Sequence, residues 1–190
     1  MLLTYKEIAT FTAGSHISRI QQNSGGPAYR FYATEQFLVD DWQSAFVSAD
    51  KEQWVKTHRD VVLAQKGDVV ISLIHGKAAR VSVDNAGRIL GNNYVKVDVD
   101  ESQINAAWFL WHFNECPEGR RQRIQTTQGS TVVQRIAVNE LKNFIVTLPS
   151  LAQQKAMGEL YLAAREKRFY QQQIAALSEQ QILSLLSGMI

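Results

Sequence analysis

The hydrophobic positions of the first 150 residues fall in short runs of strand length. Residues 69–74 form a nearly continuous apolar run, which is typical of a strand buried on both faces or in a barrel wall. Residues 78–83 and 94–99 alternate between apolar and polar, the pattern of half-buried strands, and turn-forming residues separate them. Aromatic and β-branched residues predict further strands within residues 29–39 and 144–146. This part of the chain therefore predicts a β-rich domain.

Two segments have helical patterns instead. Residues 102–115 have a broad apolar face that includes Trp108 and Trp111, with Asp100 as the predicted N-cap and Pro117 as the residue that ends the helix. Residues 151–187 contain no proline and consist mostly of strong helix formers, and Ser150 and Gln153 fit a capping box. The second segment predicts one helix of about 55 Å, at ~1.5 Å per residue.

We therefore predict an α+β fold, with a mixed or antiparallel β-rich domain over residues 1–149 and one long C-terminal α-helix within residues 150–190. The helix is much longer than the ~15 Å radius of gyration of a domain of this size, so most of it should project. Its apolar stripe favours packing against a partner helix. Packing on its own domain is the alternative, and it suits the first third of the helix better than the last. The stripe comprises Met157, Leu160, Ala164, Tyr170, Ile174, Leu177 and Leu185.

The composition is that of an ordinary folded protein, with 45% hydrophobic and 20% charged residues and a net charge of +2. A single cysteine, Cys116, cannot form a disulfide framework or a multi-cysteine zinc site within one chain. Neither a signal peptide nor an apolar stretch of membrane-spanning length is evident in the sequence. We therefore expect a cytoplasmic protein without membrane association.

The sequence lacks the common motifs of catalysis and cofactor binding. Its four histidines include no His-x-x-x-His pair, and neither a Gly-x-x-x-x-Gly-Lys phosphate loop nor a Gly-x-Gly-x-x-Gly fingerprint occurs. The Asn- or Asp-Pro-Pro-aromatic tetrapeptide of amino-methyltransferases is also absent. We expect no cofactor, no metal and no enzymatic activity of the chain alone.

Residues 119–139 contain four arginines and no acidic residue, together with Gln, Ser and Thr. Arginine binds phosphate and can contact guanine through two hydrogen bonds, whereas glutamine can read adenine in the same way. Smaller polar sets occur near residues 19–30 and at residues 77, 80 and 88. A solvated surface is the alternative interpretation of each set. The candidate DNA contacts are Arg19, Gln22, Asn23, Arg30, Lys77, Arg80, Arg120, Arg121, Arg123, Gln125, Thr126, Gln128, Ser130, Thr131, Gln134 and Arg135.

Four segments of the sequence, by their order and spacing along the chain, resemble the specificity subunits of type I restriction–modification systems. They are the apolar start that ends at Gly14, the Lys-Gly-Asp strand of residues 65–72, the Gly-Ser-Thr segment of residues 128–136, and the strand of residues 141–148 before Pro149. The resemblance extends over essentially the whole chain and matches one target-recognition domain followed by one spacer helix. Gln153 stands where the family usually has the glutamate of a Glu-Gln pair.

This resemblance implies that the domain reads double-stranded DNA in the major groove. It implies that the helix is a spacer and a platform for methyltransferase subunits, which carry out the S-adenosylmethionine chemistry, and possibly for a restriction subunit. A full subunit has two recognition domains and two helices. We therefore expect a homodimer, paired through antiparallel helices, that reads a two-part palindromic target.

Two other function classes remain open from the sequence. The first is a protein–protein adaptor with a coiled-coil assembly helix and no DNA role. The second is a hydrolase built from scattered carboxylates and lysines. Steeply salt-dependent duplex binding distinguishes the DNA-binding hypothesis from the adaptor, because neutralised phosphates release counterions.

Overall fold

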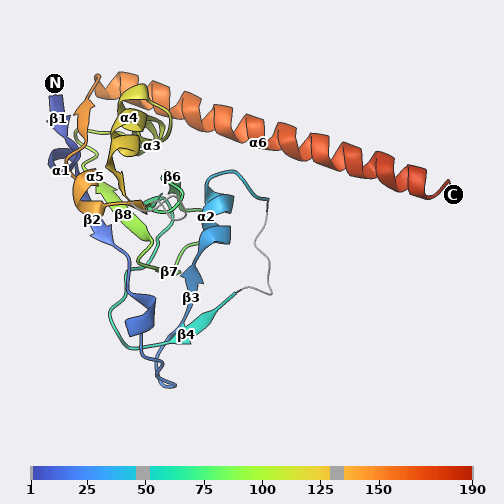
Figure 1. Ribbon diagram of the computed structural model, residues 1–190, viewed down its shortest axis with the longest axis horizontal. Coiled ribbons are helices and arrows are strands. Elements are labelled where there is room, and N and C mark those ends of the chain that lie inside the picture. The colour runs from blue at the N-terminus through green and yellow to red at the C-terminus, as the bar shows by residue number, and fades with distance from the viewer. Residues whose placement is uncertain (1, 46–51, 129–134, 190) are drawn as a thin grey trace.

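The computed structural model describes residues 2–45, 52–128 and 135–189, and its elements are shown in Figure 1. The strands are β1 (Leu2–Thr4), β2 (Ala9–Ala13), β3 (Ala28–Tyr32), β4 (Trp54–Lys56), β5 (Val69–Ser72), β6 (Lys77–Arg80), β7 (Ile89–Leu90), β8 (Tyr94–Val99), β9 (Thr127–Gln128), β10 (Arg135–Ile136) and β11 (Ile145–Thr147). The helices are α1 (Tyr5–Ile8), the short 3-10 helix η1 (Ile17–Arg19), α2 (Thr34–Asp40), α3 (Ala106–Asn114), α4 (Pro117–Thr126), α5 (Val138–Leu141) and α6 (Leu151–Ser187). The α+β prediction is confirmed.

The central sheet is antiparallel, with the strand order β2-β8-β5-β6. Its strand β5 is the predicted apolar run, and all four of its residues are buried. Val69 and Ile71 belong to the core cluster that includes α3, whereas Val70 packs in a second cluster with Phe37 of α2. The prediction of a strand buried on both faces is therefore confirmed.

Helix α3 lies between the central sheet and the start of α6. It begins later than predicted, because Asn105 is the N-cap, and its side chain accepts a hydrogen bond from the Trp108 amide at 3.0 Å. Asp100, the predicted N-cap, instead accepts hydrogen bonds from Ser102 and Gln103 in a tight turn before the helix. The side chain of Asp100 therefore caps a turn, a common role of aspartate.

The segment predicted as one strand over residues 29–39 divides into β3 and α2. The change comes at Ala33, whose amide donates to the side chain of Gln36 at 2.9 Å. This bond satisfies one of the amide groups that a helix start leaves unpaired. Phe37 then points into the second core cluster with Tyr32 and Tyr94.

Strands β4 and β3 pair antiparallel, and β3 and β7 pair parallel, in a three-stranded sheet. Together with η1 and the loops of residues 20–27 and 57–60, strands β3 and β4 form what we call the distal lobe. Figure 1 shows this lobe at the end of the globular part that is remote from α6.

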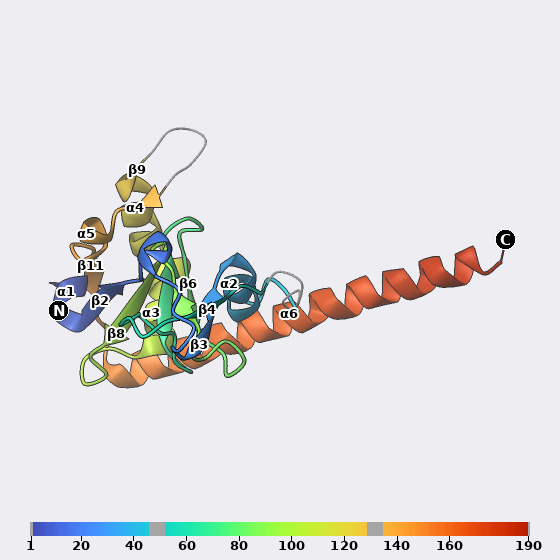
Figure 2. The same ribbon diagram turned by 90° about the horizontal axis from the view of Figure 1, so that it is seen from below.

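Helix α6 spans Leu151–Ser187, as the sequence predicts, and begins with the predicted capping box of Ser150 and Gln153. Gln154 and Gly158 are buried against the globular part. From Gln171 onward the helix is exposed at almost every residue and projects away, as Figures 1 and 2 show from two directions. The described residues contain no helix that is both long and apolar enough to span a membrane.

The predicted stripe on α6 is not a single exposed face. Met157 packs against the main core cluster, because it lies on the side of the helix that meets α3. Leu160, Tyr170, Ile174, Leu177 and Leu185 are exposed, with exposed fractions from 53% to 71%. Ala164 is exposed as well. The prediction that Met157 faces a partner helix is therefore wrong, because its side chain contacts the core of its own chain.

Candidate nucleic-acid interface

The arginine-rich segment, expected to be a polar loop, is the helix α4, which packs against α3. Pro117 ends α3 as predicted, but it also occupies the first position of α4, where its missing amide hydrogen costs nothing. Arg120, Arg121 and Gln125 are exposed on α4. Neither arginine forms a side-chain hydrogen bond or ion pair with another residue in the described ranges.

The two acidic residues beside α4, Glu115 and Glu118, each have a polar partner. Glu115 forms an ion pair with Lys77, with 2.9 Å between the carboxylate oxygen and the ammonium nitrogen. The carboxylate of Glu118 lies 3.3 Å from the Nε2 atom of the buried His112. Lys77, a predicted DNA contact, is thus held by a carboxylate. Burial lowers the pKa of His112, so its imidazole leaves the negative charge of Glu118 in place at neutral pH. Arg120 and Arg121 outnumber this one carboxylate and give the exposed side of α4 an excess of positive charge.

Two predicted contacts of this segment are engaged inside the fold. Arg123 is half-buried, donates to the carbonyls of Gly76 and Asn114, and lies over the ring of Phe113 at 5.3 Å. Burial lowers the pKa of its guanidinium. Arg135 is half-buried and donates to the carbonyl of Asn92. Both side chains therefore stabilise the fold around the β9–β10 hairpin.

The β9–β10 hairpin extends from the end of α4, and Figure 2 shows it on the side opposite α6. Its base is fixed where the Ile136 amide donates to the Leu73 carbonyl at 3.1 Å. Thr126 bonds back to the carbonyl of Gln122 at 3.0 Å. Gln128 belongs to β9, whereas Ser130, Thr131 and Gln134 lie outside the described residues.

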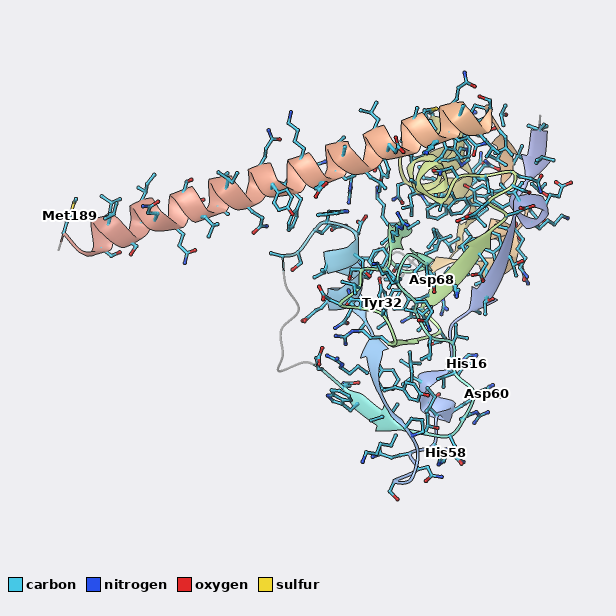
Figure 3. The ribbon with its side chains drawn as sticks, turned by 180° about the vertical axis from the view of Figure 1, so that it is seen from behind. His16, Tyr32, His58, Asp60, Asp68 and Met189 are labelled. Carbon is cyan, nitrogen blue, oxygen red and sulfur yellow. The ribbon has the colours of Figure 1, made fainter. Side chains whose placement is uncertain are left out.

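The distal lobe forms a second basic surface. Arg19, Arg30, Lys56 and Arg59 are exposed there or nearly so, and the predicted contacts Gln22 and Asn23 are exposed in the same lobe. Figure 3 shows His16, His58 and Asp60 in this lobe as well. Asp60 is the one acidic residue in this group, so the lobe is positive overall. In Figure 1, this lobe lies well apart from α4.

One face of the β3–β4 pair combines positive charge with an aromatic ring. Arg30 and Trp54 are cross-strand partners, and the guanidinium lies 4.9 Å from the centre of the Trp54 ring. Glu52 holds Arg30 at 3.1 Å and the buried Arg88 at 2.6 Å. Trp54 is 57% exposed, so its ring is accessible at the surface of the distal lobe.

Sequence reasoning missed Trp54, Lys56 and Arg59. Their signal was weak, because they lie in a stretch with more acidic than basic residues. The alternation of exposed Trp54 and Lys56 around buried Val55 was visible as a pattern, but their pairing with β3 is a long-range contact. Of the remaining polar set, Arg80 is exposed and Arg88 is buried.

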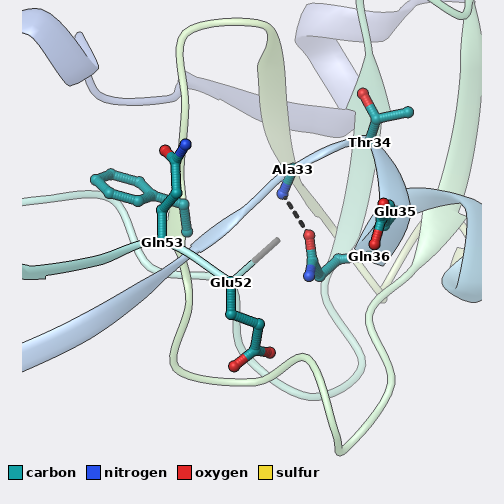
Figure 4. A pocket seen from close by; sticks show the side chains of 7 residues that line it. Ala33, Thr34, Glu35, Gln36, Glu52 and Gln53 are labelled. Carbon is teal, nitrogen blue, oxygen red and sulfur yellow. Dashed lines mark hydrogen bonds between the residues drawn. The ribbon is translucent and has the colours of Figure 1, made fainter. Parts of the chain in front are cut away.

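A hollow of about 530 Å³ adjoins the distal lobe (Figure 4). Thr34, Glu35, Gln36, Glu52 and Gln53 line it, together with residues at the end of β3. Its two carboxylates differ in their surroundings, because Glu52 is held by Arg30 and Arg88. Within the described ranges, no three His, Cys, Asp or Glu side chains are grouped as a metal would require.

The motifs that carry the sequence resemblance have structural roles. A side chain at Gly14 would place its Cβ 2.1 Å from the Gly91 carbonyl oxygen, because β2 passes directly against this backbone. Gly67 has a φ of +89°, and the Asp68 carboxylate accepts from the Gln65 amide at 2.7 Å and pairs with Lys96 at 3.0 Å. Gly14, Gly67 and Asp68 therefore support the backbone of the central sheet and of the turns beside it.

Comparison with solved structures identifies the fold. An HsdS subunit from Thermoanaerobacter tengcongensis matches 92% of this chain with a TM-score of 0.58 and 15% identity. A chain from a type I R-M system, whose structure concerns complex assembly and conformational transition, matches 100% of this chain with a TM-score of 0.64 and 13% identity. A type I restriction–modification S subunit from M. genitalium matches 87%, with a TM-score of 0.50 and 12% identity.

These matches confirm the resemblance predicted from the sequence at the level of the fold. The chain spans 39%, 48% and 39% of the lengths of these three solved chains. No protein-family model matches the sequence, and no curated protein matches it either.

Proposed function

We propose, from the fold shared with type I specificity subunits, that this chain recognises double-stranded DNA and directs partner subunits to it without catalysing a reaction itself. The observation that carries the proposal is that fold, which covers at least 87% of the chain in each of the three comparisons. Two exposed basic surfaces, on α4 and on the distal lobe, support it.

The exposed face of α4 is proposed to bind the DNA backbone. Arg120 and Arg121 are exposed and have no carboxylate partner in the described ranges, so they can neutralise phosphates without first breaking an ion pair. Gln125, on the same helix face as Arg121, and Gln128 at the start of the hairpin are proposed to read base edges. Ser130, Thr131 and Gln134 remain candidates from their chemistry.

The distal lobe is proposed as a second contact with the same duplex. Arg19, Lys56 and Arg59 provide positive charge, and Arg30 with Trp54 provides a stacked pair that can lie against the sugar–phosphate backbone. Two separate contacts fix the orientation of a recognition domain on DNA better than one. This arrangement explains why the basic residues are divided between distant parts of the chain.

Helix α6 is proposed to pair with the same helix of a second copy. Leu160 and Ile174 are separated by two heptads, and Tyr170 and Leu177 by one, so the four residues can form one seam. This seam lies opposite Arg165, which faces the globular part, because nine residues correspond to two and a half helical turns. An antiparallel pair would present two recognition domains to a two-part palindromic site.

The proposed partners are methyltransferase subunits, which supply the chemistry, and a restriction subunit where one is present. One of the solved structures concerns complex assembly of a type I R-M system, and this supports the proposal for a chain of the same fold. The long exposed surface of α6 outside the seam is available for such subunits.

Binding of the purified chain to duplex DNA at several salt concentrations tests the proposal. We expect log affinity to fall linearly with log salt concentration, with a slope of about −0.9 for each phosphate contact. Absent or salt-independent binding, also with a methyltransferase partner added, would favour the protein–protein adaptor. Metal-dependent cleavage of DNA by the chain alone would instead favour a hydrolase.

A further inference from the structure

Helix α2 ends in an unusual way at Trp42. Trp42 has a φ of +56° and is the one non-glycine residue with positive φ in the described ranges. Its amide donates to the Val39 carbonyl at 3.0 Å, and the Gln43 amide donates to the Leu38 carbonyl at 2.8 Å. This is the Schellman pattern of helix termination, in which glycine normally occupies the left-handed position. A bulky residue at such a position indicates that its side chain is needed there.

The side chain of Trp42 packs on α6. Its ring lies 5.5 Å from the ring of Phe169 and 6.4 Å from the ring of Tyr170, both edge-on. The preceding residue also contacts this helix, because the buried Asp41 carboxylate accepts from the Arg165 guanidinium at 2.9 Å. Arg165 donates to the Asp41 backbone carbonyl as well.

The side chain of Asp41 is only 4% exposed, so its charge is costly without a partner. Burial raises the pKa of Asp41, and the Arg165 guanidinium and the Gln43 amide oppose this rise. The ion pair and the aromatic contact are adjacent, and together they bind the end of α2 to one turn of α6.

This contact lies beyond the segment of α6 that docks on α3. In that segment, Gln154 bonds to the Asn105 amide at 2.9 Å and to the Gln103 and Pro149 carbonyls, and Gly158 lies against α3. The segment continues to Tyr161, whose hydroxyl accepts from the Asn114 side chain at 3.1 Å. From Gln154 to Arg165 the helix rises about 17 Å, at ~1.5 Å per residue. The contacts of Asp41 and Trp42 therefore lengthen the attached part of α6 and restrict its pivoting about α3.

We infer that Asp41, Trp42, Arg165 and Phe169 form a brace that fixes the direction of α6 and thereby sets the distance between the two half-sites that a paired molecule reads. The inference concerning spacing rests on the proposed function, whereas the brace itself does not. Ser184 lies about 39 Å from Gly158, so a pivot of about 10° would move it by about 7 Å. Since one base pair spans about 3.4 Å, this movement equals about two base pairs.

Two variants test the brace. Trp42→Gly removes the aromatic contact but suits the left-handed backbone, so the globular part should remain folded. Arg165→Met removes the ion pair and keeps a long apolar side chain. Glu166→Gln is the matched control, because Glu166 is the exposed neighbour on the same helix. Thermal unfolding checks that each variant is folded.

Spin labels on cysteines introduced at Thr10 and Ser184, in a Cys116→Ser background, report the direction of α6. Labelled chains are diluted into an excess of unlabelled chains, so that the distances arise within one molecule. We expect a narrow distance distribution for the parent and Glu166→Gln, and a distribution broadened by several Å for Trp42→Gly and Arg165→Met. Unchanged distributions in both brace variants would overturn the brace.

The second measurement uses unlabelled proteins and duplexes whose half-sites are separated by different numbers of base pairs. We expect the parent to prefer one spacing at least fivefold over spacings that differ by two base pairs, and the brace variants to lose this preference. Equal spacing preference in parent and brace variants would overturn the role in spacing. If the distances broaden but the parent binds no two-part DNA, the brace stands, and the proposed function and the role in spacing fail together.

Discussion

The arginines of residues 120–135 look alike in the sequence but have two different roles in the structure. Arg120 and Arg121 are exposed, whereas Arg123 and Arg135 bind backbone carbonyls within the fold. The composition of the segment predicted a basic surface. It could not predict which arginines face outward, because that depends on the helical period of α4 and on the position of the β5–β6 turn.

This division predicts opposite effects for two substitutions. The double variant Arg120→Ala/Arg121→Ala should weaken binding to every duplex and reduce the salt slope by about 1 for each phosphate that is no longer neutralised, with unchanged stability. Arg123→Ala should lower the free energy of unfolding by about 1–3 kcal/mol, because it removes the hydrogen bonds to the Gly76 and Asn114 carbonyls and the contact with the Phe113 ring. Fluorescence titration with DNA and urea unfolding measure the two effects. Unchanged stability of Arg123→Ala would contradict its structural role.

His112 makes stability depend on pH. The imidazole is buried, with Nδ1 at 2.7 Å from the Tyr5 hydroxyl and Nε2 near Glu118. Burial lowers its pKa below 6.5, although Glu118 opposes this shift. The unfolded chain therefore binds a proton that the folded chain excludes. Above about pH 7.5, His112 has no effect on the free energy of unfolding, because it is uncharged in both states. Below about pH 6.5, the free energy of unfolding decreases as the pH falls, by at most about 1.4 kcal/mol per pH unit.

Urea unfolding between pH 8 and pH 5 measures this loss, with His112→Gln as the comparison. The variant should show a flatter dependence on pH in this range, because it has no imidazole to protonate. Parallel curves for the two proteins would show that other groups cause the dependence.

At the scale of elements, the sequence predicts those with strong local patterns. The strands β5 and β8 and the helix α6 were predicted from apolar runs, alternation and capping residues. Helix α2 and helix α4 were not. The segment that contains α2 has the aromatic and β-branched residues that are typical of a strand. Helix α4 contains too few apolar residues to show a helical periodicity. Both helices form because they dock on neighbouring elements.

The docking of α6 on α3 depends on Gly158. A Cβ at this position would lie 2.6 Å from the Trp108 amide nitrogen and 2.8 Å from the Ala107 Cβ. Gly158→Val should therefore destabilise the protein by about 1–3 kcal/mol through overpacking. Gly188→Val is a matched control, since its added Cβ would have no contact below 3.6 Å. Equal unfolding free energies for the two variants would contradict the close packing of α6.

At the scale of the whole molecule, the sequence predicts a globular part with a projecting helix, and the structure shows this arrangement. The division of the basic surface between α4 and the distal lobe was not predicted. It arises from pairings between distant residues, such as Arg30 with Trp54, which no local pattern encodes. The face of α6 that meets α3 also depends on this tertiary arrangement, which is why Met157 was misplaced.

The assembly of the molecule should depend on one face of α6. Ile174→Lys/Leu177→Lys should convert a dimer into a monomer at micromolar concentration, because it places charges in the proposed helix seam. Leu183→Lys is the control, since Leu183 is 57% exposed but lies on the same side of the helix as Arg165. Light scattering after size-exclusion chromatography measures the mass. A monomeric parent, or a dimer that survives the double substitution, would contradict the seam.

The central claim is that this chain chooses the DNA sequence at which partner subunits act. Methylome sequencing of otherwise identical cells, with and without an intact copy of the chain, tests this claim most directly. We expect one two-part motif to be methylated in cells with the chain and to lose its methylation in cells without it. Identical methylation patterns in both strains, with the methyltransferase subunits expressed, would contradict the claim.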